Sequence, residues 1–449
     1  MSGARCDPGA QQTTADPVQV LRTLGMLAIL QLALPVNLAV TAVALARSAL
    51  VSAPRAVATE PKTVLVSGGK MTKALQLARS FHAAGHRVVL VESTKYRLTG
   101  HRFSRAVDRF HTVPDPQDPE YAEALLRIVR AEGVDVYVPV SSPAASHADA
   151  RAKAALSAYC EVVHADPDLV ARLDDKEAFT ALADSLGLPT PQSHRVTTPE
   201  QVAEFDFAGA GRDFILKSIP YDPVHRLDLT PLPRPTQAET GDFALSKPIS
   251  AQSPWVLQEL LTGQEYCTHS TVRNGRVQVW CCCPSSPWQM NYEMVDKPAI
   301  RAWVTDFVGA LRLTGQVSFD FIETADGSIH PIECNPRTHS AITLFHDHPD
   351  LTAAYLDDDQ PVITPLTGSR ATYWIYHEVW RLLTEPGRVH RMRTIVAGKD
   401  AVFDASDPLP FLLLHHLHIP WLLLRSLWHG TPWVRIDLAI GKLVEPAGD

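Results

Sequence analysis

The sequence predicts a mixed α/β (α+β) protein, with a doubly wound front domain, a two-part domain that contains an antiparallel sheet, and an apolar extension at each end. Strand patterns alternate with helical patterns in the front region, as in a parallel sheet. Strand patterns separated by Gly-containing turns follow, as in a run of hairpins. The expected units are a flexible tail at 1–16, an apolar membrane-associating helix at 17–52, the front domain at 62–165, the second domain at 166–355 and an extension at 356–449.

The composition is that of a globular protein with several packed units. Of 449 residues, 45% are hydrophobic and 20% are charged, so the chain can bury more than one core. Its formal net charge of −8 gives no basic footprint of the kind that a nucleic-acid binder uses to neutralise phosphates, so DNA and RNA are not expected as partners. The seven cysteines include no CxxC pair, which predicts reduced thiols. The triplet at 281–283 predicts a buried strand, because neighbouring strand residues cannot converge on one metal ion.

The first apolar stretch predicts contact with a membrane. Residues 25–46 are 22 residues without a charge, which as a helix span about 33 Å, enough for a bilayer core. Arg22 before the stretch and small residues near its end also fit a signal peptide. Pro35 and Asn37 in the middle fit a kinked or half-inserted helix. We expect the helix at 17–52 either to cross the membrane or to lie on it, in an orientation that flanking arginines leave open.

The front domain is predicted from three buried strands and the helices between them. The strands are expected at 63–67, 87–92 and 134–140, and the helices at 70–84 and about 122–132. This alternation is typical of a doubly wound parallel sheet.

A glycine turn follows the first strand. It resembles the end of a phosphate-binding P-loop, but Val64 stands where that motif needs glycine and Met71 where it needs Ser or Thr. Two interpretations remain open. Gly68 and Gly69 expose amides at a helix start to a polar substrate group, or they form a tight strand-to-helix turn without a ligand.

The second domain begins with a helical pattern at 166–186 and continues as strands. Turns at 274–275 (Asn-Gly) and 326–327 (Asp-Gly) join neighbouring strands into hairpins. An amphipathic helix at about 299–313 interrupts them. The strands are expected at 214–217, 255–260, 266–272, 277–283, 317–322 and 329–334.

The second apolar stretch, residues 411–428, is rich in leucine and contains two tryptophans. This pattern suits a helix at a membrane interface, and a buried core helix is the alternative. Three histidines in the stretch lack a nearby carboxylate, so packing is the expected role rather than metal binding. They are His415, His416 and His418.

An acidic hairpin is the candidate functional site. The turn at 326–327 brings the strand of Asp320 beside the strand that carries Glu333 and Asn335, so three oxygen ligands share one face. Such ligands suit Mg²⁺, which fills its other positions with water and phosphate. Arg337, two residues further on, is placed to meet a phosphoryl group. The alternative is a solvated turn.

Two lysines support a phosphate site. Lys217 ends the apolar strand at 214–217, where an unpaired ammonium group would be costly without an anion. Lys176 opens a helix after two aspartates, and an ordinary surface lysine is its alternative.

These residues occur in the order found in the ATP-grasp superfamily, which the chain resembles over residues 62–355. The resemblance implies an ATP-dependent ligase that forms a carbon–nitrogen bond and uses ATP and Mg²⁺, with Mn²⁺ as an alternative ion. It rests on Lys176, Lys217, Gln258-Glu259-Leu260-Leu261, Glu265, Asp320 and Glu333-Cys334-Asn335-Pro336-Arg337.

By this resemblance, each residue has an expected role. Lys176 and Lys217 would contact the nucleotide phosphates, and Glu265 would bind ribose. Adenine would lie beside Gln258 and be read by the backbone of Glu259, Leu260 and Leu261. Asp320, Glu333 and Asn335 would hold magnesium, and Arg337 with Lys217 would act in catalysis. One part departs from the carboxylase-like members: residues 218–223 replace the expected Gly-rich phosphate lid, and Arg226 in that loop is a candidate phosphate clamp.

A narrower resemblance is to the mycosporine-glycine synthase family. It rests on the segments at 67–73, 100–104 and 335–343 and extends into both terminal regions. It implies that the enol of 4-deoxygadusol, a cyclohexenone, is phosphorylated and condensed with glycine, releasing ADP and phosphate. The candidate substrate residues are Lys70, Arg102, Thr338, His339 and Ser340.

Several alternatives stay open at this level. The chain is expected to act on small molecules in the cytoplasm, with its N-terminal segment at a membrane and a homodimer as one possible assembly. For His339 the roles of general base and hydrogen-bonded structural residue are even. The loop at 284–292 either covers the acceptor or is a plain surface loop. The rival functions are a carboxylate–amine ligase that forms an amide bond and a non-catalytic nucleotide-binding membrane protein.

Overall fold

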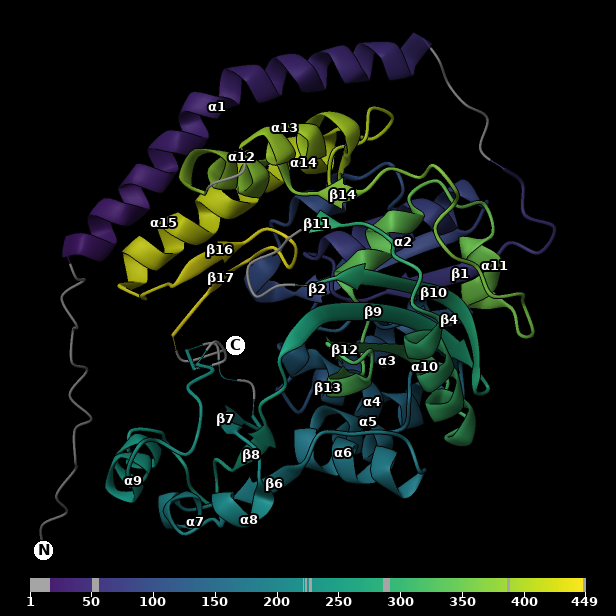
Figure 1. Cartoon of the computed structure of the whole chain (residues 1–449). Helices are drawn as coiled ribbons and strands as arrows, with labels where there is room; N and C mark the ends of the chain where they lie inside the picture. The colour runs from purple at the N-terminus through teal and green to yellow at the C-terminus, as the bar shows by residue number, and fades with distance from the viewer. Residues whose placement is uncertain are drawn as a thin grey trace, which may run out of the picture.

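The computed structural model describes residues 17–50, 56–220, 222, 224–225, 228–285, 291–385 and 388–446. A long helix, α1 (Pro17–Leu50), arches over one side of the molecule and the C-terminal extension packs beneath it (Figure 1). The tail at 1–16, Arg226 and most of the loop at 284–292 lie outside the described residues.

The front domain is a five-stranded parallel sheet with the order β3-β2-β1-β4-β5. Apolar, largely β-branched sequences form its buried strands, which confirms the predicted doubly wound sheet. The strands are β1 (Thr63–Val66), β2 (Arg87–Ser93), β3 (Arg109–Val113), β4 (Val136–Val138) and β5 (Glu161–Val162). The helices and short turns are α2 (Thr72–Ala83), η1 (Thr94–Tyr96), η2 (Gly100–Phe103), α3 (Tyr121–Glu132) and α4 (Pro143–Leu156).

The second domain is antiparallel, as predicted, but its strands form two separate sheets rather than one. A three-stranded sheet has the order β6-β8-β7 and a four-stranded sheet has the order β10-β9-β12-β13. Helix α10 packs with α6 on an aromatic core that includes Trp303, Phe307 and Phe319. The strands are β6 (Ser193–Val196), β7 (Phe214–Ser218), β8 (Trp255–Glu259), β9 (Gly263–Arg273), β10 (Arg276–Pro284), β12 (Gly315–Thr324) and β13 (Ile329–Asn335). The helices are α5 (Pro167–Asp174), α6 (Lys176–Ser185), α7 (Pro199–Ala203), α8 (Phe207–Ala210), α9 (Gln237–Leu245), α10 (Pro298–Ala310), η3 (Ser340–Phe345) and α11 (Leu351–Leu356).

The helical pattern at 166–186 forms two helices rather than one. Asp175 adopts an extended conformation between α5 and α6, and its carboxylate accepts hydrogen bonds from the backbone N–H groups of Glu177 and Ala178. This N-cap starts a new helix at Lys176, as the position of that lysine after two aspartates indicated.

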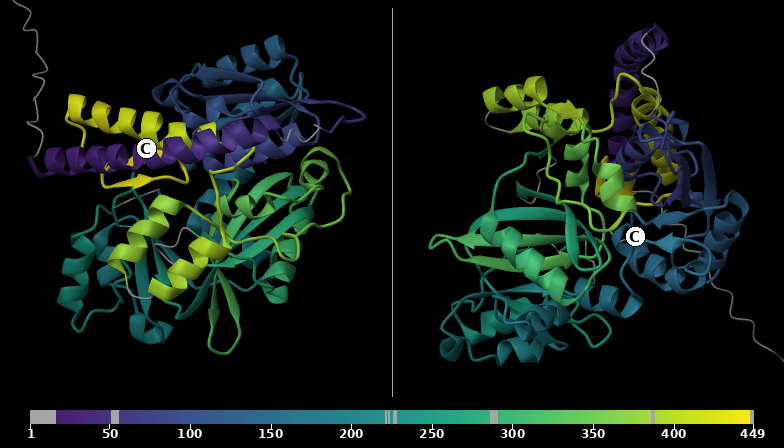
Figure 2. Two further views of the ribbon diagram at one scale, coloured as in Figure 1. Left: turned by 90° about the horizontal axis from the view of Figure 1, so that it is seen from above. Right: turned by 90° about the vertical axis from the view of Figure 1, so that its right-hand side faces the viewer.

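The C-terminal extension wraps back onto the front domain and α1 (Figure 2). Its elements are β14 (Thr372–Tyr373), which pairs with β11 (Asn291–Tyr292) and β15 (Lys399–Asp400), then the helices α12 (Ile375–Thr384) and α13 (Arg388–Ala397). A continuous helical stretch follows as α14 (Leu409–Leu413), the π-helical η4 (Leu414–His418) and α15 (Ile419–His429). The chain ends with the hairpin of β16 (Arg435–Asp437) and β17 (Lys442–Val444).

The stretch at 411–428 is helical, and much of its apolar surface is buried inside the protein. Phe411, Leu414 and Leu423 belong to a core cluster that also contains Leu30 of α1. His418 is buried, and its Nε2 lies 2.7 Å from the carbonyl oxygen of Gly441. On its inner face this segment is therefore a core helix, which was the alternative interpretation.

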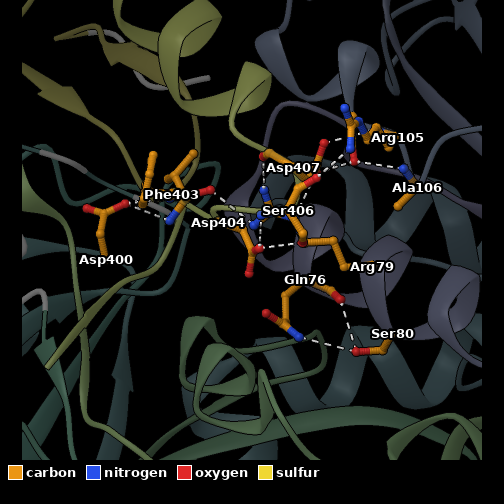
Figure 3. Close-up of polar contacts among 12 residues, drawn as sticks. Gln76, Arg79, Ser80, Arg105, Ala106, Asp400, Phe403, Asp404, Ser406 and Asp407 are labelled. Atoms are coloured by element: carbon orange, nitrogen blue, oxygen red, sulfur yellow. Dashed lines mark hydrogen bonds and ion pairs between the residues drawn. The ribbon is translucent and has the colours of Figure 1, made fainter. Parts of the chain in front are cut away.

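A polar lock attaches the extension to the front domain (Figure 3). The Asp407 carboxylate accepts hydrogen bonds from Arg79 Nε at 2.9 Å and from Ser104 Oγ at 2.6 Å. It also accepts one from the backbone N–H of Arg105 at 2.9 Å. Since Asp407 and Arg79 are both largely buried, this lock fixes the loop at 400–407 against α2 and η2.

Within the described residues, α1 is the one helix long and apolar enough to cross a membrane, judged by length and composition alone. A signal sequence or a core helix satisfies the same criterion. Of its most apolar 18-residue window, 17% is buried in the protein. Pro35 lies inside the helix.

Candidate active site

The acidic hairpin predicted from the sequence is formed by β12 and β13. Asp320 and Glu333 lie directly opposite each other in the antiparallel register, and a bulge follows Asp320. On its other side Asp320 faces Cys267 of β9. The two carboxylates are therefore half-buried, on β12 and on the edge strand β13, and lie away from the turn at 326–327.

Three cations surround Glu333. Lys176 Nζ, at the start of α6, lies 3.6 Å from Glu333 Oε2. Although burial raises the pKa of Glu333, the positive charges of Lys176, Lys217 and Arg337 outweigh it and hold the pKa below its usual range. Glu333 keeps 35% of its side chain exposed, so a ligand from solvent can reach it. The structure thus brings together the two lysines and the arginine from three separate elements.

The pKa of Asp320 is shifted in the opposite direction to that of Glu333. Burial, together with the neighbouring carboxylates of Glu333 and Glu265, raises its pKa to about 8. Lys217 also lies in this field: burial lowers its pKa, whereas Glu333, Glu265 and Asp320 counteract the shift. Two adjacent carboxylates that repel each other gain most from a multivalent cation placed between them.

Arg337 is held by two acceptors. It donates one hydrogen bond to Asn335 Oδ1 and another, at 3.2 Å, to Asp174 Oδ1. Asn335 in turn donates to Glu333 Oε1 at 3.1 Å. Asp174 also lies 3.0 Å from His147 Nε2. This chain of contacts fixes the guanidinium group next to the carboxylate pair.

The donor set fits a magnesium ion. Asp320, Glu333 and Asn335 offer oxygen atoms on adjacent strand positions, which is the chemistry that Mg²⁺ prefers. Among the described residues no group of three or more His, Cys, Asp or Glu side chains forms a metal site. An ion at this position would therefore depend on phosphate or water for its remaining ligands.

The predicted adenine residues lie at the end of β8. Gln258 is buried, and its side chain reaches the carbonyl oxygen of Ile332 on β13 at 3.5 Å. The Glu259 carboxylate pairs with Arg212. The backbone N–H groups of Glu259 and Leu260 donate to the carbonyl oxygens of Gln192 and Asp213, both at 2.8 Å. These two amides are therefore already bound within the protein. In the described part of the chain the amide of Leu261 has no such acceptor, so it is the better candidate to read adenine.

Glu265, the predicted ribose ligand, lies on β9 opposite Ile322 of β12. Its Oε1 accepts a hydrogen bond from Ser285 Oγ at 3.1 Å. It lies close enough to Asp320 and Lys217 to shift the pKa of both groups. The residue is thus part of the same electrostatic cluster as the carboxylate pair.

The candidate substrate residues after Arg337 occupy a buried turn. The carbonyl oxygen of Thr338 accepts a hydrogen bond from Lys73 Nζ. His339 caps η3 by accepting from the backbone N–H of Ala341 at 3.2 Å, and burial lowers its pKa to about 3. A histidine that is already engaged in a cap and is neutral fits the structural role better than that of a general base. Ser340 follows as the first residue of η3.

Lys70 and Arg102 lie in different places. Lys70 Nζ lies 3.4 Å from Glu92 Oε1 and 4.3 Å from the centre of the Tyr96 ring. Arg102 instead donates to the carbonyl oxygen of Arg97 at 2.8 Å and stacks over Phe110. Within the described residues Arg102 makes no contact with the other site residues, so its assignment to the substrate has no geometric support.

A pocket of about 240 Å³ opens at the carboxyl ends of the parallel strands, with Lys70 on its wall. Ser67, Ser93 and Ser142 line it from β1, β2 and the loop after β4. Ligands of open parallel sheets bind at this edge. One helical turn beyond Ser142, Ser146 Oγ donates to the carbonyl oxygen of Pro336 at 2.8 Å. The pocket therefore lies close to the turn that carries Arg337.

Comparisons with known proteins find similarity in structure. No protein-family profile matches the chain, and a search of curated proteins finds no match. N5-carboxyaminoimidazole ribonucleotide synthetase in complex with ADP superposes with a TM-score of 0.52 at 15% identity, covering 71% of this chain and 82% of the other. Biotin carboxylase from Campylobacter jejuni gives 0.52 at 13% identity, with 67% and 73% covered. N5-carboxyaminoimidazole synthetase from Staphylococcus aureus gives 0.51 at 14% identity, with 70% and 83% covered.

The chain has the ATP-grasp fold. This confirms the fold expected from the order of the motifs.

The sequence assigned no role of its own to Lys73. This residue lies on α2 of the front domain, and its side chain reaches the turn after Arg337. It is buried and donates hydrogen bonds to the carbonyl oxygens of Ser141, at 3.2 Å, and Thr338. Its place three residues after Lys70, in the segment at 67–73 that carries the narrower resemblance, was the available signal. Asp174 is the second hydrogen-bond acceptor of Arg337. The sequence indicated only that it lies close to Lys176.

The Lys73 ammonium group is expected to make stability depend on pH. Burial lowers its pKa from 10.5 to about 7, with the like charges of Arg337 and Lys70 adding to the shift. Between these two pH values the unfolded chain binds this proton and the folded protein does not. Stability relative to Lys73→Met should therefore rise with pH from about 7 to about 10, by at most about 1.4 kcal/mol per pH unit.

Urea unfolding of both proteins at pH 7, 8 and 9 measures this difference. Lys62→Met is the control, because Lys62 also donates to a backbone carbonyl, that of Leu356 at 3.0 Å, but is partly exposed. A difference between wild type and Lys73→Met that stays constant over this range would contradict the assignment.

Proposed function

We propose that the protein is an ATP-dependent ligase that phosphorylates a small acceptor and replaces the phosphate with an amine. The observation that supports it is the convergence of Lys176, Lys217 and Arg337 on Glu333, next to Asp320. Three cations around two carboxylates are matched to a triphosphate together with a divalent cation. The ATP-grasp fold supports ATP as the ligand of this cluster.

The nucleotide would lie between the two antiparallel sheets. Its adenine would meet the backbone at Leu261 and its ribose would meet Glu265, while Lys176 and Lys217 hold the phosphates. Asp320, Glu333 and Asn335 would hold Mg²⁺, which when bound neutralises part of the phosphate charge. Arg337, fixed by Asn335 and Asp174, would stabilise the charge on the transferring phosphoryl group.

The acceptor would occupy the pocket at the end of the parallel sheet. Its volume of about 240 Å³ suits a small ring compound, and Lys70 offers a cation to an acidic oxygen there. Ser146, the residue after the pocket-lining Ala145, donates a hydrogen bond to the carbonyl oxygen of Pro336, the residue before Arg337. A short path from the acceptor to the phosphoryl group is what in-line transfer needs.

For the acceptor itself we propose the enol of 4-deoxygadusol, with glycine as the amine, from the resemblance of the segments at 67–73, 100–104 and 335–343. An enolised 1,3-dicarbonyl is a vinylogous carboxylic acid. Its enolate oxygen attacks the γ-phosphorus and ADP leaves. The amine of glycine then adds to the carbon that carries the phosphate, loses a proton, and phosphate departs. Mycosporine-glycine, ADP and phosphate are the products.

A substrate assay tests the proposal. Purified protein with ATP, Mg²⁺, 4-deoxygadusol and glycine should release ADP and phosphate in equal amounts and form a new ultraviolet-absorbing adduct. If ADP were released only with carboxylate acceptors, the acceptor would be a carboxylate rather than an enol, and the protein would be an amide-forming ligase. ATP binding without turnover on either class would support a non-catalytic role.

A larger side chain in the pocket should weaken binding of the acceptor and leave binding of ATP unchanged. Ala145 lines the pocket from the first turn of α4, so Ala145→Leu should raise the KM for the acceptor on the order of tenfold through steric exclusion. The Kd for ATP, measured by calorimetry, should stay unchanged. Ala154→Leu, at an exposed position of the same helix, is the control. Unchanged acceptor kinetics in Ala145→Leu would place the acceptor elsewhere.

A further inference from the structure

Helix α1 has an inverted distribution of polarity. Its buried residues follow one stripe, and three of the five are polar: they are Thr23, Leu30, Asn37, Thr41 and Ala44. The outward side is apolar, and Leu32 for example exposes 80% of its surface. The other large exposed side chains are Val18, Leu21, Leu24, Ile29, Val36, Leu38, Val40, Val43 and Leu50. A surface helix in water has the reverse arrangement, so the outward side is built for an apolar environment.

Polar contacts hold α1 flat along the protein. The Trp433 indole N–H donates to Thr23 Oγ1 at 2.9 Å, and the Arg22 guanidinium lies 4.0 Å from the centre of the same ring. Further along the helix, Asn37 Nδ2 donates to the Tyr376 hydroxyl at 2.6 Å.

The packed stripe from Thr23 to Ala44 covers about 32 Å of helix, close to the thickness of a bilayer core. If α1 crossed a membrane, the elements packed along it would lie at the same depth. These elements include α15, which carries Arg425, and the residues Trp433 and Val434, which Arg22 contacts and which lie directly before the charged strand β16 (Arg435–Asp437). Such charged groups would be costly in hydrocarbon.

The hairpin of α12 and α13 repeats this inversion. Glu378 is completely buried, 3.4 Å from Arg381 and 3.6 Å from Arg391. The outer sides of both helices expose apolar residues, with Trp380 at 61% and Leu383 at 69%. The remaining ones are Val379, Val389, Met392 and Val396. The charges of Glu378, Arg381 and Arg391 thus face inward, while apolar side chains face outward, in a second element.

The two elements lie on the same side of the molecule. The Asn37–Tyr376 contact joins α1 to the start of α12, and both elements lie at the top in Figure 1 and in the right-hand view of Figure 2. The helices α1, α12, α13 and α15 together contain seven arginines. Arg381 and Arg391 are paired with the buried Glu378 and with Glu385, whereas Arg47 and Arg393 are exposed. Because the whole chain has a net charge of −8, this side is basic against an acidic background, which suits an anionic lipid surface.

We propose that α1 and the α12–α13 hairpin form the membrane-binding face of a monotopic protein, inserted into one leaflet of an anionic bilayer with α1 parallel to its plane. This goes beyond the ligase activity, because it assigns the bilayer as a binding partner and fixes how the protein lies on it. The strands β12 and β13 lie well away from α1 in Figure 1, so the carboxylate pair stays on the aqueous side.

Flotation with lipid vesicles tests the binding. The full-length protein should float with vesicles of phosphatidylcholine and phosphatidylglycerol (3:1), and binding to pure phosphatidylcholine should be weaker by several-fold. Leu32→Glu and Leu383→Glu should each lower the bound fraction at least tenfold. Leu245→Glu, at a site on α9 that is 64% exposed and far from this face in Figure 1, should not. All three side chains are exposed, so unchanged thermal melting confirms that the variants fold.

The depth of insertion separates a flat helix from a spanning one. In a Cys6→Ser background, a fluorophore attached at Leu32→Cys and one at Leu383→Cys should both be quenched by shallow doxyl lipids. Quenching of the Leu32 label by bilayer-centre quenchers, with the Leu383 label in water, would indicate a spanning helix and overturn the proposal. So would failure to float with either vesicle, or lipid-independent dimers that Leu32→Glu converts to monomers.

Discussion

Asp320→Asn should lower ATP-dependent turnover by at least about 1000-fold while ATP still binds. The substitution keeps the size of the side chain and removes one of the two carboxylates that face each other across β12 and β13. Without it, the site loses half of its charge for a divalent cation and with it the stabilisation of the transferring phosphoryl group. The remaining cations still attract phosphate, so the Kd for ATP should change by less than about tenfold.

Release of ADP under saturating ATP and acceptor measures the loss, and calorimetry measures ATP binding. Asp306→Asn makes the same chemical change at an exposed position of α10 and should leave both quantities unchanged. Turnover of Asp320→Asn within threefold of wild type would rule out the proposed metal site.

Arg337→Lys should reduce kcat on the order of 100-fold although the charge is kept. The guanidinium group donates to Asn335 and Asp174 at once, and a lysine ammonium group cannot reproduce this planar, two-sided contact. The cation would then lose its fixed position beside Glu333. Since the effect concerns the transition state, the KM for ATP should change little.

Steady-state kinetics with both substrates separates these two effects. Arg276→Lys is the matched control, because Arg276 pairs with Asp359 at the protein surface, where both side chains are mostly exposed, and such pairs contribute little. If Arg337→Lys raised only the KM for ATP, Arg337 would act in ground-state binding rather than in phosphoryl transfer.

Much of this site follows from local sequence patterns. Asp320 and Glu333 face each other because a short Asp-Gly turn fixes the register of two alternating strands. Lys176 starts a helix because Asp175 caps it. Each of these features depends on residues that are close in sequence. The order of the motifs along the chain then indicated the ATP-grasp fold.

Other parts depend on packing between distant segments and could not be predicted. Asp174 and Arg337 meet across 163 positions of sequence, and Lys73 reaches Thr338 across 265. No periodicity encodes such contacts. Likewise, the apolar composition of α1 predicted a membrane, but which side faces the protein depends on single polar residues such as Asn37, whose partner Tyr376 lies 339 positions away.

The contacts around Asp407 have a practical consequence for producing the protein. Because Arg79 and Ser104 of the front domain bind this carboxylate, ending the recombinant chain before residue 400 would leave these two front-domain groups without their buried partner. A water-soluble preparation for crystallisation is therefore better sought by replacing outward apolar residues, such as Leu32 and Leu383, than by trimming either terminus.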